Sequence, residues 1–239
     1  MRADLTQDFM VSNGSAEARA STLNFRHVRG WIFDLDNTLY PFGAQVLIDA
    51  EERICRFIQD HLALERNEAW RLQKECLKED GATLAGLVRR FKIDPEAYFA
   101  FVNDVDVTTL TPAPELARAL ARLPGRRIVF TNNCGRHAAR VLKQLGIAGA
   151  FHEICDLRSI GFKAKPAASG YEAVIARAGV PAEACAMFED HERNLAPAHA
   201  LGLTTVWIRH PAHGDSWPAH VHHPIDDLTH FLQTIEVRS

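Results

Sequence analysis

Short apolar runs alternate with amphipathic stretches along most of the chain. The first run, residues 28–36, passes from Trp31-Ile32-Phe33 into Asp34-Leu35-Asp36, which indicates a buried strand with its polar end at the edge of a sheet. From residue 114 onward strands and helices alternate regularly, which predicts a parallel sheet with helices on both faces. The later strands are predicted at 127–131, 151–155, 185–188 and 204–208, and the helices at 115–123, 136–145, 169–178, 192–201 and 228–235.

Residues 42–110 show a different pattern, because apolar residues recur there at helical spacing and no strand is evident. Asp94 suits the N-cap of one helix, with Pro95 at its first position. A structureless loop of this length would be unusual inside a domain, so the block is predicted to be an inserted all-helical domain. The predicted organisation is a mobile tail at 1–25, a three-layer α/β core with a doubly wound parallel sheet at 26–41 and 111–239, and the helical insertion at 42–110.

Composition and charge narrow the function classes. With 47% hydrophobic and 24% charged residues, the chain of 239 residues is typical of a globular protein. Its net charge of −3 argues against binding to a nucleic-acid polymer, which usually requires a basic excess. No apolar run approaches the roughly 18 residues of a membrane span, and the first 24 residues lack the apolar centre of a signal peptide. The five cysteines form no CxxC pair, which favours reduced thiols and a cytoplasmic location.

Polar side chains follow the ends of the predicted strands, and the carboxyl ends of parallel strands meet at one edge of a sheet. Four of these side chains are carboxylates, which repel one another unless a hard cation joins them, and oxygen-only ligands favour Mg²⁺. One aspartate can attack phosphorus while another moves a proton, and neutral donors with one lysine suit phosphate oxygens. The pattern therefore predicts phosphoryl transfer from a small phosphorylated metabolite. The residues concerned are Asp34, Asp36, Thr131, Asn132, Lys165, Glu189 and Asp190.

The order of these residues resembles the motifs of the haloacid dehalogenase (HAD) superfamily. Asp34-Leu35-Asp36-Asn37-Thr38 resembles its DxDxT signature, and Thr131, Lys165 and Glu189-Asp190 follow in the order of its other three motifs. The helical insertion is similar in position and size to the helical cap of that superfamily, whose core is Rossmann-like. More narrowly, four stretches are similar to the pyrimidine 5′-nucleotidase subfamily, namely 33–41, 81–87, 123–127 and 131–132.

The resemblance implies a role for each site residue. Asp34 would attack phosphorus to form an aspartyl-phosphate, and Asp36 would act as general acid and then activate water. Thr131, Asn132 and Lys165 would hold the phosphoryl group. Mg²⁺ would be bound by Asp34, the carbonyl of Asp36 and Asp190, together with Glu189. The implied substrate is a pyrimidine nucleoside 5′-monophosphate.

Two departures from the subfamily pattern keep other readings open. Asn133-Cys134 follows Thr-Asn where the subfamily often has a small residue, and Glu189-Asp190 stands where Asp-Asp is common. The second departure resembles sugar-phosphate mutases, so a sugar-phosphate phosphatase or a phosphotransferase is the alternative. A non-catalytic phosphate or nucleotide binder is disfavoured, because a binder has no use for mutually repelling acids.

Several other residues have simpler interpretations. Lys163 competes with Lys165 for the lysine role, but the Lys165-Pro166 dipeptide favours Lys165, and Asn194 is expected to orient the site or to lie on a helix face. His137 is expected to be an ordinary residue at a helix start and Cys134 a packing residue. The six histidines after residue 209 match no zinc spacing, and an exposed tail with a final helix explains them.

Overall fold

The computed structural model describes residues 23–210, 212–214 and 216–238. Most of the predicted mobile tail, residues 1–22, lies outside the described residues. The end of that predicted tail is packed, since Phe25 is 1% exposed and its ring stacks on Trp31 with centroids 6.1 Å apart. Asn24 also forms a parallel bridge with Glu236. The tail boundary predicted at residue 25 is therefore too late, because an aromatic side chain there completes the core.

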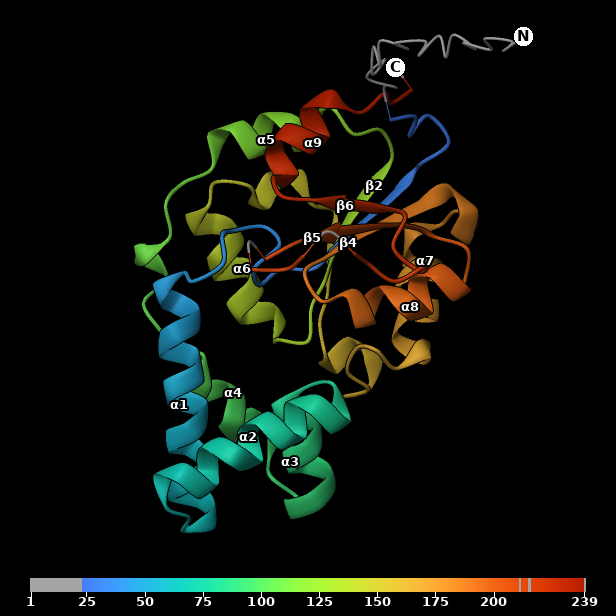
Figure 1. Ribbon diagram of the computed structural model, residues 1–239. Helices are drawn as coiled ribbons and strands as arrows, with labels where there is room; N and C mark the ends of the chain where they lie inside the picture. Colours follow the sequence, from blue (N-terminus) through green and yellow to red (C-terminus); the bar gives the residue numbers. More distant parts are fainter. Residues whose placement is uncertain (1–22, 211, 215, 239) are drawn as a thin grey trace, which may run out of the picture.

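Six parallel strands form one sheet in the order β3-β2-β1-β4-β5-β6, which confirms the predicted α/β fold class (Figure 1). β1 lies in the middle, and its Phe33 pairs with Val129 on one side and Phe188 on the other. The strands are β1 (Gly30–Phe33), β2 (Arg126–Phe130), β3 (Glu153–Cys155), β4 (Cys185–Glu189), β5 (Thr204–Ile208) and β6 (His223–Ile225).

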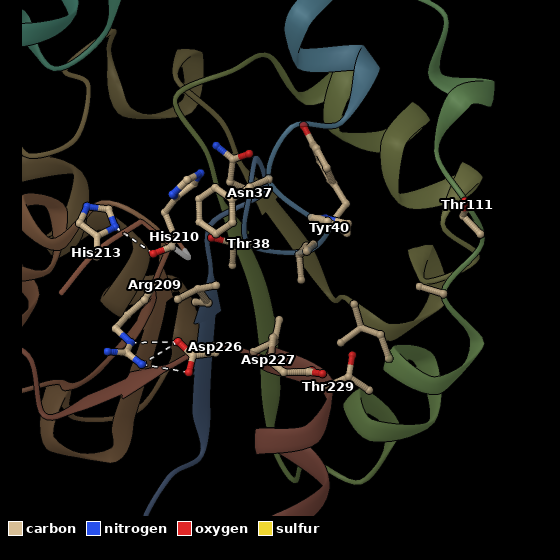
Figure 2. Close-up of a pocket in the computed structure, with 17 residues that line it drawn as sticks. Asn37, Thr38, Tyr40, Thr111, Arg209, His210, His213, Asp226, Asp227 and Thr229 are labelled. Carbon is tan, nitrogen blue, oxygen red and sulfur yellow. Dashed lines mark hydrogen bonds and ion pairs between the residues drawn. The ribbon is translucent and has the colours of Figure 1, made fainter. Parts of the chain in front are cut away.

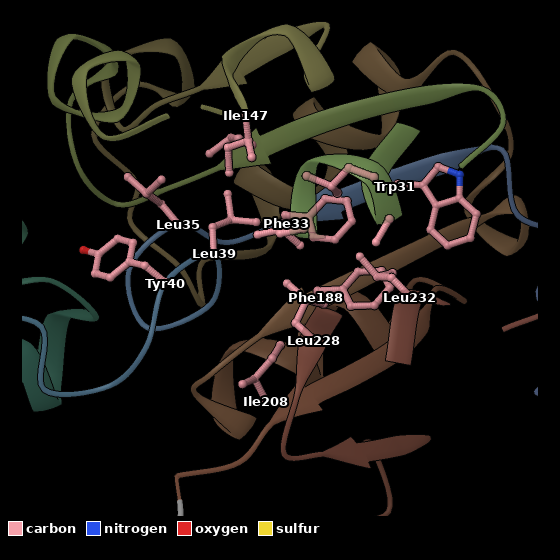
Figure 3. Packing of buried hydrophobic residues seen from close by; sticks show 14 of the residues in the cluster. Trp31, Phe33, Leu35, Leu39, Tyr40, Ile147, Phe188, Ile208, Leu228 and Leu232 are labelled. Carbon is pink, nitrogen blue, oxygen red and sulfur yellow. The ribbon is translucent and has the colours of Figure 1, made fainter. Parts of the chain in front are cut away.

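Helices cover both faces of the sheet, and all elements predicted from residue 114 onward are present with bounds shifted by at most two residues. Side chains of β1 alternate between the faces: Trp31 and Phe33 belong to one buried cluster and Ile32 to the other. Figure 3 shows Trp31 and Phe33 packed with Phe188 and Leu232. The first cluster lies under α5 (Pro114–Ala121), α6 (Gly135–Gln144) and α9 (Leu228–Thr234), and the second under α7 (Ala168–Ala178) and α8 (Glu192–Ala200).

The segment after residue 209 contains an additional strand, so the prediction of an exposed tail there is wrong. β6 forms the edge of the sheet, and Val221, Ile225 and Leu228 are buried. Its three residues include Pro224, which hides the strand from sequence reading because proline usually interrupts strands. Proline is tolerated at this position because an edge strand can leave one side of its backbone unpaired.

Four helices fill the predicted insertion and lie together beside the sheet (Figure 1). Asp94 caps the last of them as predicted, since its side chain accepts hydrogen bonds from the backbone N–H groups of Glu96 and Ala97. Within the described residues no helix is long and apolar enough to cross a membrane. The helices are α1 (Gln45–Leu62), α2 (Arg66–Asp80), α3 (Thr83–Phe91) and α4 (Pro95–Val102), and short 3₁₀ turns lie at Val107–Thr109, Ala148–Ala150, Arg158–Ile160 and Ala182–Ala184.

Candidate active site

The two aspartates of the first motif lie where the central strand ends. The backbone N–H of Asp34 donates to the carbonyl of Phe188 at 2.9 Å, which extends the pairing of β1 with β4 by one residue. The chain then turns at Asn37, whose φ of 59° lies in the left-handed region that asparagine tolerates better than most residues. This turn places Asp34 in the wall of a cavity between the sheet and helices α1–α4, and the residue is 6% exposed.

The structure brings Lys165, which was expected at the site from its position before a helix, into the same cavity. Its Nζ donates to Asp34 Oδ1 at 2.5 Å, to Glu189 Oε2 at 2.7 Å and to the carbonyl of Phe130 at 3.0 Å. The side chain is fully buried, and a buried ammonium is stable only when its protons are paired in this way. Lys163, the competing candidate, is exposed.

The two acidic residues at the end of β4 differ in their hydrogen-bond partners. Glu189 accepts from Lys165 through one oxygen, and its other oxygen accepts from Asn194 Nδ2 at 3.1 Å and from the backbone N–H of His191 at 3.3 Å. Asp190 Oδ2 accepts from Asn37 Nδ2 at 3.2 Å. Both oxygens of Glu189 are thus engaged by donors of the chain, whereas Asp190 has one such donor and faces the cavity. Asn194 orients Glu189, one of the two roles expected from the sequence.

Thr131 and Asn132 follow β2 and line the same cavity. The hydroxyl of Thr131 accepts from the backbone N–H of Asn133 at 3.0 Å, which fixes the turn after the strand. The carboxamide of Asn132 accepts from the N–H of Lys165 at 2.8 Å and donates to the carbonyls of Lys165 and Gly81, each at 3.3 Å. Its side chain therefore holds the lysine loop in place.

Some backbone N–H groups in the cavity wall remain available for an anion. The N–H groups of Asp36 and Asn132 make no hydrogen bond with any residue that the structure describes. Free N–H groups that converge from neighbouring loops form a favourable place for phosphate oxygens.

Tyr40 is a site residue that sequence reasoning missed. Its hydroxyl donates to Asp36 Oδ1 at 2.5 Å, and its ring is buried at 4% exposure. The only sequence signal was its place in the stretch 33–41, because a contact between residues four apart in a loop follows no periodicity. Asn37, which contacts Asp190, was likewise noted only as a neighbour of the aspartates.

Burial and neighbouring negative charge set the electrostatics of the site. Burial, and next the charge of Glu189, raise the pKa of Asp34 to about 7 and that of Asp190 to about 10. Burial also opposes ionisation of Glu189 and Lys165, but charges and hydrogen bonds together outweigh it. The charge of Lys165 and hydrogen bonds lower the pKa of Glu189, and the charges of Asp34 and Glu189 raise the pKa of Lys165. One lysine thus faces several carboxylates.

This acidic group has the composition of a metal site. Carboxylate oxygens of Asp34, Glu189 and Asp190 lie within 4.8 Å of one another. The donors are oxygens only, and a hard divalent cation at this point would offset the repulsion between the ionised carboxylates. The residues present therefore fit Mg²⁺.

All seven residues predicted for the site line one cavity of about 240 Å³, which we call the catalytic cavity. Its floor is formed by the strand ends and the loops that follow them. Its opposite wall comes from α1–α4 and contributes mainly apolar side chains. That wall contains Leu47, Ile54, Gln73, Leu77, Leu84, Tyr98, Phe99 and Val102.

A larger pocket of about 850 Å³ lies next to the loop that carries the aspartates (Figure 2). It is lined by Tyr40, Phe42 and His210, and by Arg209, which pairs with Asp226 at 2.9 Å. Asp34, Lys165 and the Glu189-Asp190 pair do not line it. The reactive groups therefore belong to the smaller cavity, despite the greater volume of its neighbour.

His137 and Cys134 lie outside the catalytic cavity and line a third one, of about 290 Å³. His137 is 2% exposed, and burial lowers its pKa. Cys134 is 3% exposed and its Sγ accepts from Asn103 Nδ2 at 3.3 Å. Cys134 is thus a packing residue, as expected, and His137 lies in the first turn of α6, as expected, where it is also buried.

Comparisons with known proteins agree with this geometry. Residues 28–202 match the haloacid dehalogenase-like hydrolases. Over 192 residues the chain is 30% identical to "Phosphate metabolism protein 8" of Saccharomyces cerevisiae, and the match covers 74% of this chain but only 60% of the yeast protein. It is 26% identical to a "Glyceraldehyde 3-phosphate phosphatase" of Methanocaldococcus jannaschii, over 76% of this chain and 85% of that protein.

Among solved structures, CbbY from Rhodobacter sphaeroides in complex with phosphate has the same fold. The TM-score is 0.61 at 18% identity, and the match covers 86% of this chain and 96% of that one. The sheet order, the four ordered motifs and the match to residues 28–202 lead to one conclusion. The chain belongs to the haloacid dehalogenase-like hydrolases.

Proposed function

We propose that this protein is a Mg²⁺-dependent phosphatase that hydrolyses small phosphate monoesters through an aspartyl-phosphate on Asp34. The observation that carries the proposal is the arrangement around Asp34: one oxygen is held by Lys165 at 2.5 Å, and the group lies in a cavity with Asp36 and Asp190. Two of the similar curated proteins are named as phosphatases, which supports the same reaction class.

In the first half of the reaction an Asp34 oxygen attacks phosphorus and the bond from phosphorus to the leaving oxygen breaks. Asp36, oriented by Tyr40, gives its proton to that oxygen. In the second half Asp36 takes a proton from water, the water oxygen attacks phosphorus, and phosphate leaves Asp34 free. Each half therefore balances with one proton carried by Asp36.

The remaining residues position the lysine, the phosphoryl oxygens and the metal ion. Glu189 fixes Lys165 against Asp34, and the N–H groups of Asp36 and Asn132 receive phosphoryl oxygens. Asp34, Asp190 and the carbonyl of Asp36 would hold Mg²⁺, which neutralises the dianionic phosphate when bound. Because its oxygens are already engaged, Glu189 acts mainly as the anchor of the lysine.

Two substrate classes remain candidates. Similarity of residues 33–41 to pyrimidine 5′-nucleotidases supports nucleoside 5′-monophosphates. The catalytic cavity of about 240 Å³, together with the relatives named for glyceraldehyde 3-phosphate, supports a shorter sugar phosphate. The five cysteines of the chain are all buried and unpaired, which supports a reducing, cytoplasmic location.

Phosphate release from a panel of nucleotides and short sugar phosphates, with Mg²⁺ or with a chelator, tests the proposal. Asp34→Asn should lower kcat by at least about 10³-fold, because the amide cannot form the covalent intermediate. Asp60→Asn, at an exposed position on α1, is the matched control and should leave kcat unchanged. Full activity of Asp34→Asn, or of the wild type in chelator, would refute the mechanism.

A further inference from the structure

Two buried residues of helices α1–α4 carry polar atoms without a hydrogen-bond partner in the part of the chain that the structure describes. Gln73, on α2, is 2% exposed and lines the catalytic cavity, yet its Oε1 is buried and accepts no hydrogen bond from any described residue. A buried acceptor without a donor costs free energy, so native proteins rarely leave one unless something else supplies the donor. Tyr98, on α4, lines the same cavity at 5% exposure, and its hydroxyl also lacks a partner among the described residues.

The wall around these two groups carries no positive charge. Among the described residues of α1–α4, no lysine, arginine or histidine lines the cavity. The one acid there, Glu51, is paired with Lys74 at 2.9 Å. A carboxylate or second phosphate on the leaving group would therefore be buried without a counter-charge, which is strongly unfavourable.

The position of Gln73 relative to Asp34 is fixed by the end of its helix. Arg193 of α8 donates to the carbonyls of Leu77 and Lys78, and Asn132 donates to the carbonyl of Gly81, where α2 ends. Because Asn132 also holds Lys165, the end of α2 is connected to the reacting groups through hydrogen bonds.

We infer that Gln73, together with Tyr98, binds the leaving group of the substrate, and that this group is short, uncharged and hydroxylated. The inference rests on the proposed phosphatase function. Hydroxyl groups supply the donor that Gln73 Oε1 lacks, and the apolar side chains beside it suit the carbon chain. The volume of the cavity, about 240 Å³, is also smaller than the roughly 300–1,000 Å³ of pockets that bind larger ligands.

The test is a double-mutant cycle between Gln73 and the hydroxyl groups of the substrate. Gln73→Met keeps the length of the side chain and removes its amide. With glycerol 3-phosphate we expect kcat/KM to fall about tenfold, the loss typical of one hydrogen bond. With propyl phosphate, which lacks the hydroxyls, the same variant should stay within about twofold of wild type. Gln233→Met, on the exposed side of α9, is the matched control and should change neither value.

Charge and size of the leaving group are tested with the wild type alone. We expect 3-phosphoglycerate and uridine 5′-monophosphate each to show a lower kcat/KM than glycerol 3-phosphate. A higher value for either overturns the inference, as does an equal loss on glycerol 3-phosphate and propyl phosphate in Gln73→Met, or no loss on either. If Gln73→Met does not fold, as judged by circular dichroism, these wild-type comparisons decide.

The phosphatase function and the role of Gln73 in binding the leaving group are contradicted by different results. Absence of phosphate release from every compound, p-nitrophenyl phosphate included, contradicts the phosphatase function and the inference with it. Turnover that is insensitive to Gln73 contradicts only the assignment of the leaving group.

Discussion

At the scale of single residues, the contact between Tyr40 and Asp36 gives the proposed proton carrier a defined orientation. The 2.5 Å hydrogen bond joins a buried phenol to a carboxyl that lines the catalytic cavity. A proton donor is most useful when the leaving oxygen is a poor leaving group, because a strongly acidic phenol departs without protonation. Tyr40 is therefore a positioning residue whose importance should depend on the substrate.

Tyr40→Phe removes the hydroxyl and keeps the ring in its buried place. We expect kcat/KM for alkyl phosphates to fall about tenfold, while kcat/KM for p-nitrophenyl phosphate falls less than about twofold, because kcat/KM reports the first half of the reaction and excludes the later activation of water by Asp36. Steady-state kinetics on both substrates measure this. Equal losses on the two substrates would show that the ring only supports the loop.

The sequence indicates the residue types of this site but not their pairing. Asp34 could be assigned to this edge of the sheet because it follows a strand, and Lys165 because its place before a helix matches the order of the four motifs. Two contacts depend on side-chain reach within about 3 Å: both oxygens of Glu189 accept from donors of the chain, and the carboxamide of Asn132 binds backbone groups of the lysine loop. No periodicity in the sequence encodes distances of that size.

At the scale of elements, α8 and the end of α2 are joined by one guanidinium. Arg193 Nη2 donates to the carbonyl of Leu77 at 2.8 Å and its Nη1 to that of Lys78 at 3.1 Å. The last carbonyls of a helix have no partners within it and carry partial negative charge, so a cation there is favourable. This contact connects the sheet body to the wall that contains Gln73.

Arg193→Ala should loosen α2 without disturbing the sheet. We expect a loss of about 1–2 kcal/mol in the free energy of unfolding and faster hydrogen exchange in the second half of α2, because two charge-assisted hydrogen bonds are removed. Hydrogen exchange read by mass spectrometry measures the local effect. Arg193→Lys retains the charge and should show a smaller change, and uniform exchange changes across all helices would contradict a local role.

The turn between α2 and α3 approaches the lysine loop very closely. Gly81 has a φ of 80°, and a Cβ on it would lie 2.1 Å from the carbonyl oxygen of Lys165. Gly81→Ala should therefore displace Lys165, lower kcat and destabilise the protein by more than the cost of a left-handed residue. Gly161→Ala isolates that cost, about 1–2 kcal/mol, because its φ is 67° and no atom lies within 4 Å. Equal effects of the two variants on melting temperature and kcat would contradict the prediction.

Most elements could be predicted because their apolar periodicity is long enough to identify. The helices around Val141 and Val174 and the strand at Trp31 are of this kind. β6 could not be predicted, because three residues that include Pro224 carry no alternation. The packing of Phe25 was equally hidden, since a lone aromatic after a polar stretch becomes part of the core only through contacts with distant residues.

At the scale of the whole molecule, the buried acids connect stability to metal and pH. The pKa of Asp34 is raised to about 7 and that of Asp190 to about 10, whereas carboxyls of an unfolded chain titrate near 4. Between those values the folded state binds more protons than the unfolded state, so the free energy of unfolding decreases as pH rises. Glu189 has a lowered pKa and does not titrate in this interval.

The metal-free protein should therefore melt at a lower temperature at pH 8.5 than at pH 6. Mg²⁺ should raise the melting temperature at both pH values and raise it more at pH 8.5, because the cation binds the ionised carboxylates. Scanning calorimetry with and without Mg²⁺ measures both effects. Asp190→Asn removes one titrating ligand and should reduce both the pH dependence of the melting temperature and its increase with Mg²⁺. An increase with Mg²⁺ that is equal at the two pH values would contradict the proposal that these acids bind the cation.

The order of strands in the sheet affects folding during synthesis. β1 is the first strand to be synthesised, but its two neighbours come much later in the chain: Gly30 pairs with Arg126 on one side and with Cys185 on the other. At about 5–20 residues per second, roughly eight to thirty seconds pass before the second neighbour leaves the ribosome. Throughout that time Trp31, Ile32 and Phe33 have unpaired edges that can capture other chains. The strand that precedes Asp34 is thus exposed to aggregation in the nascent chain, and the yield of folded protein in a cell should depend on chaperones that shield this strand until β4 arrives.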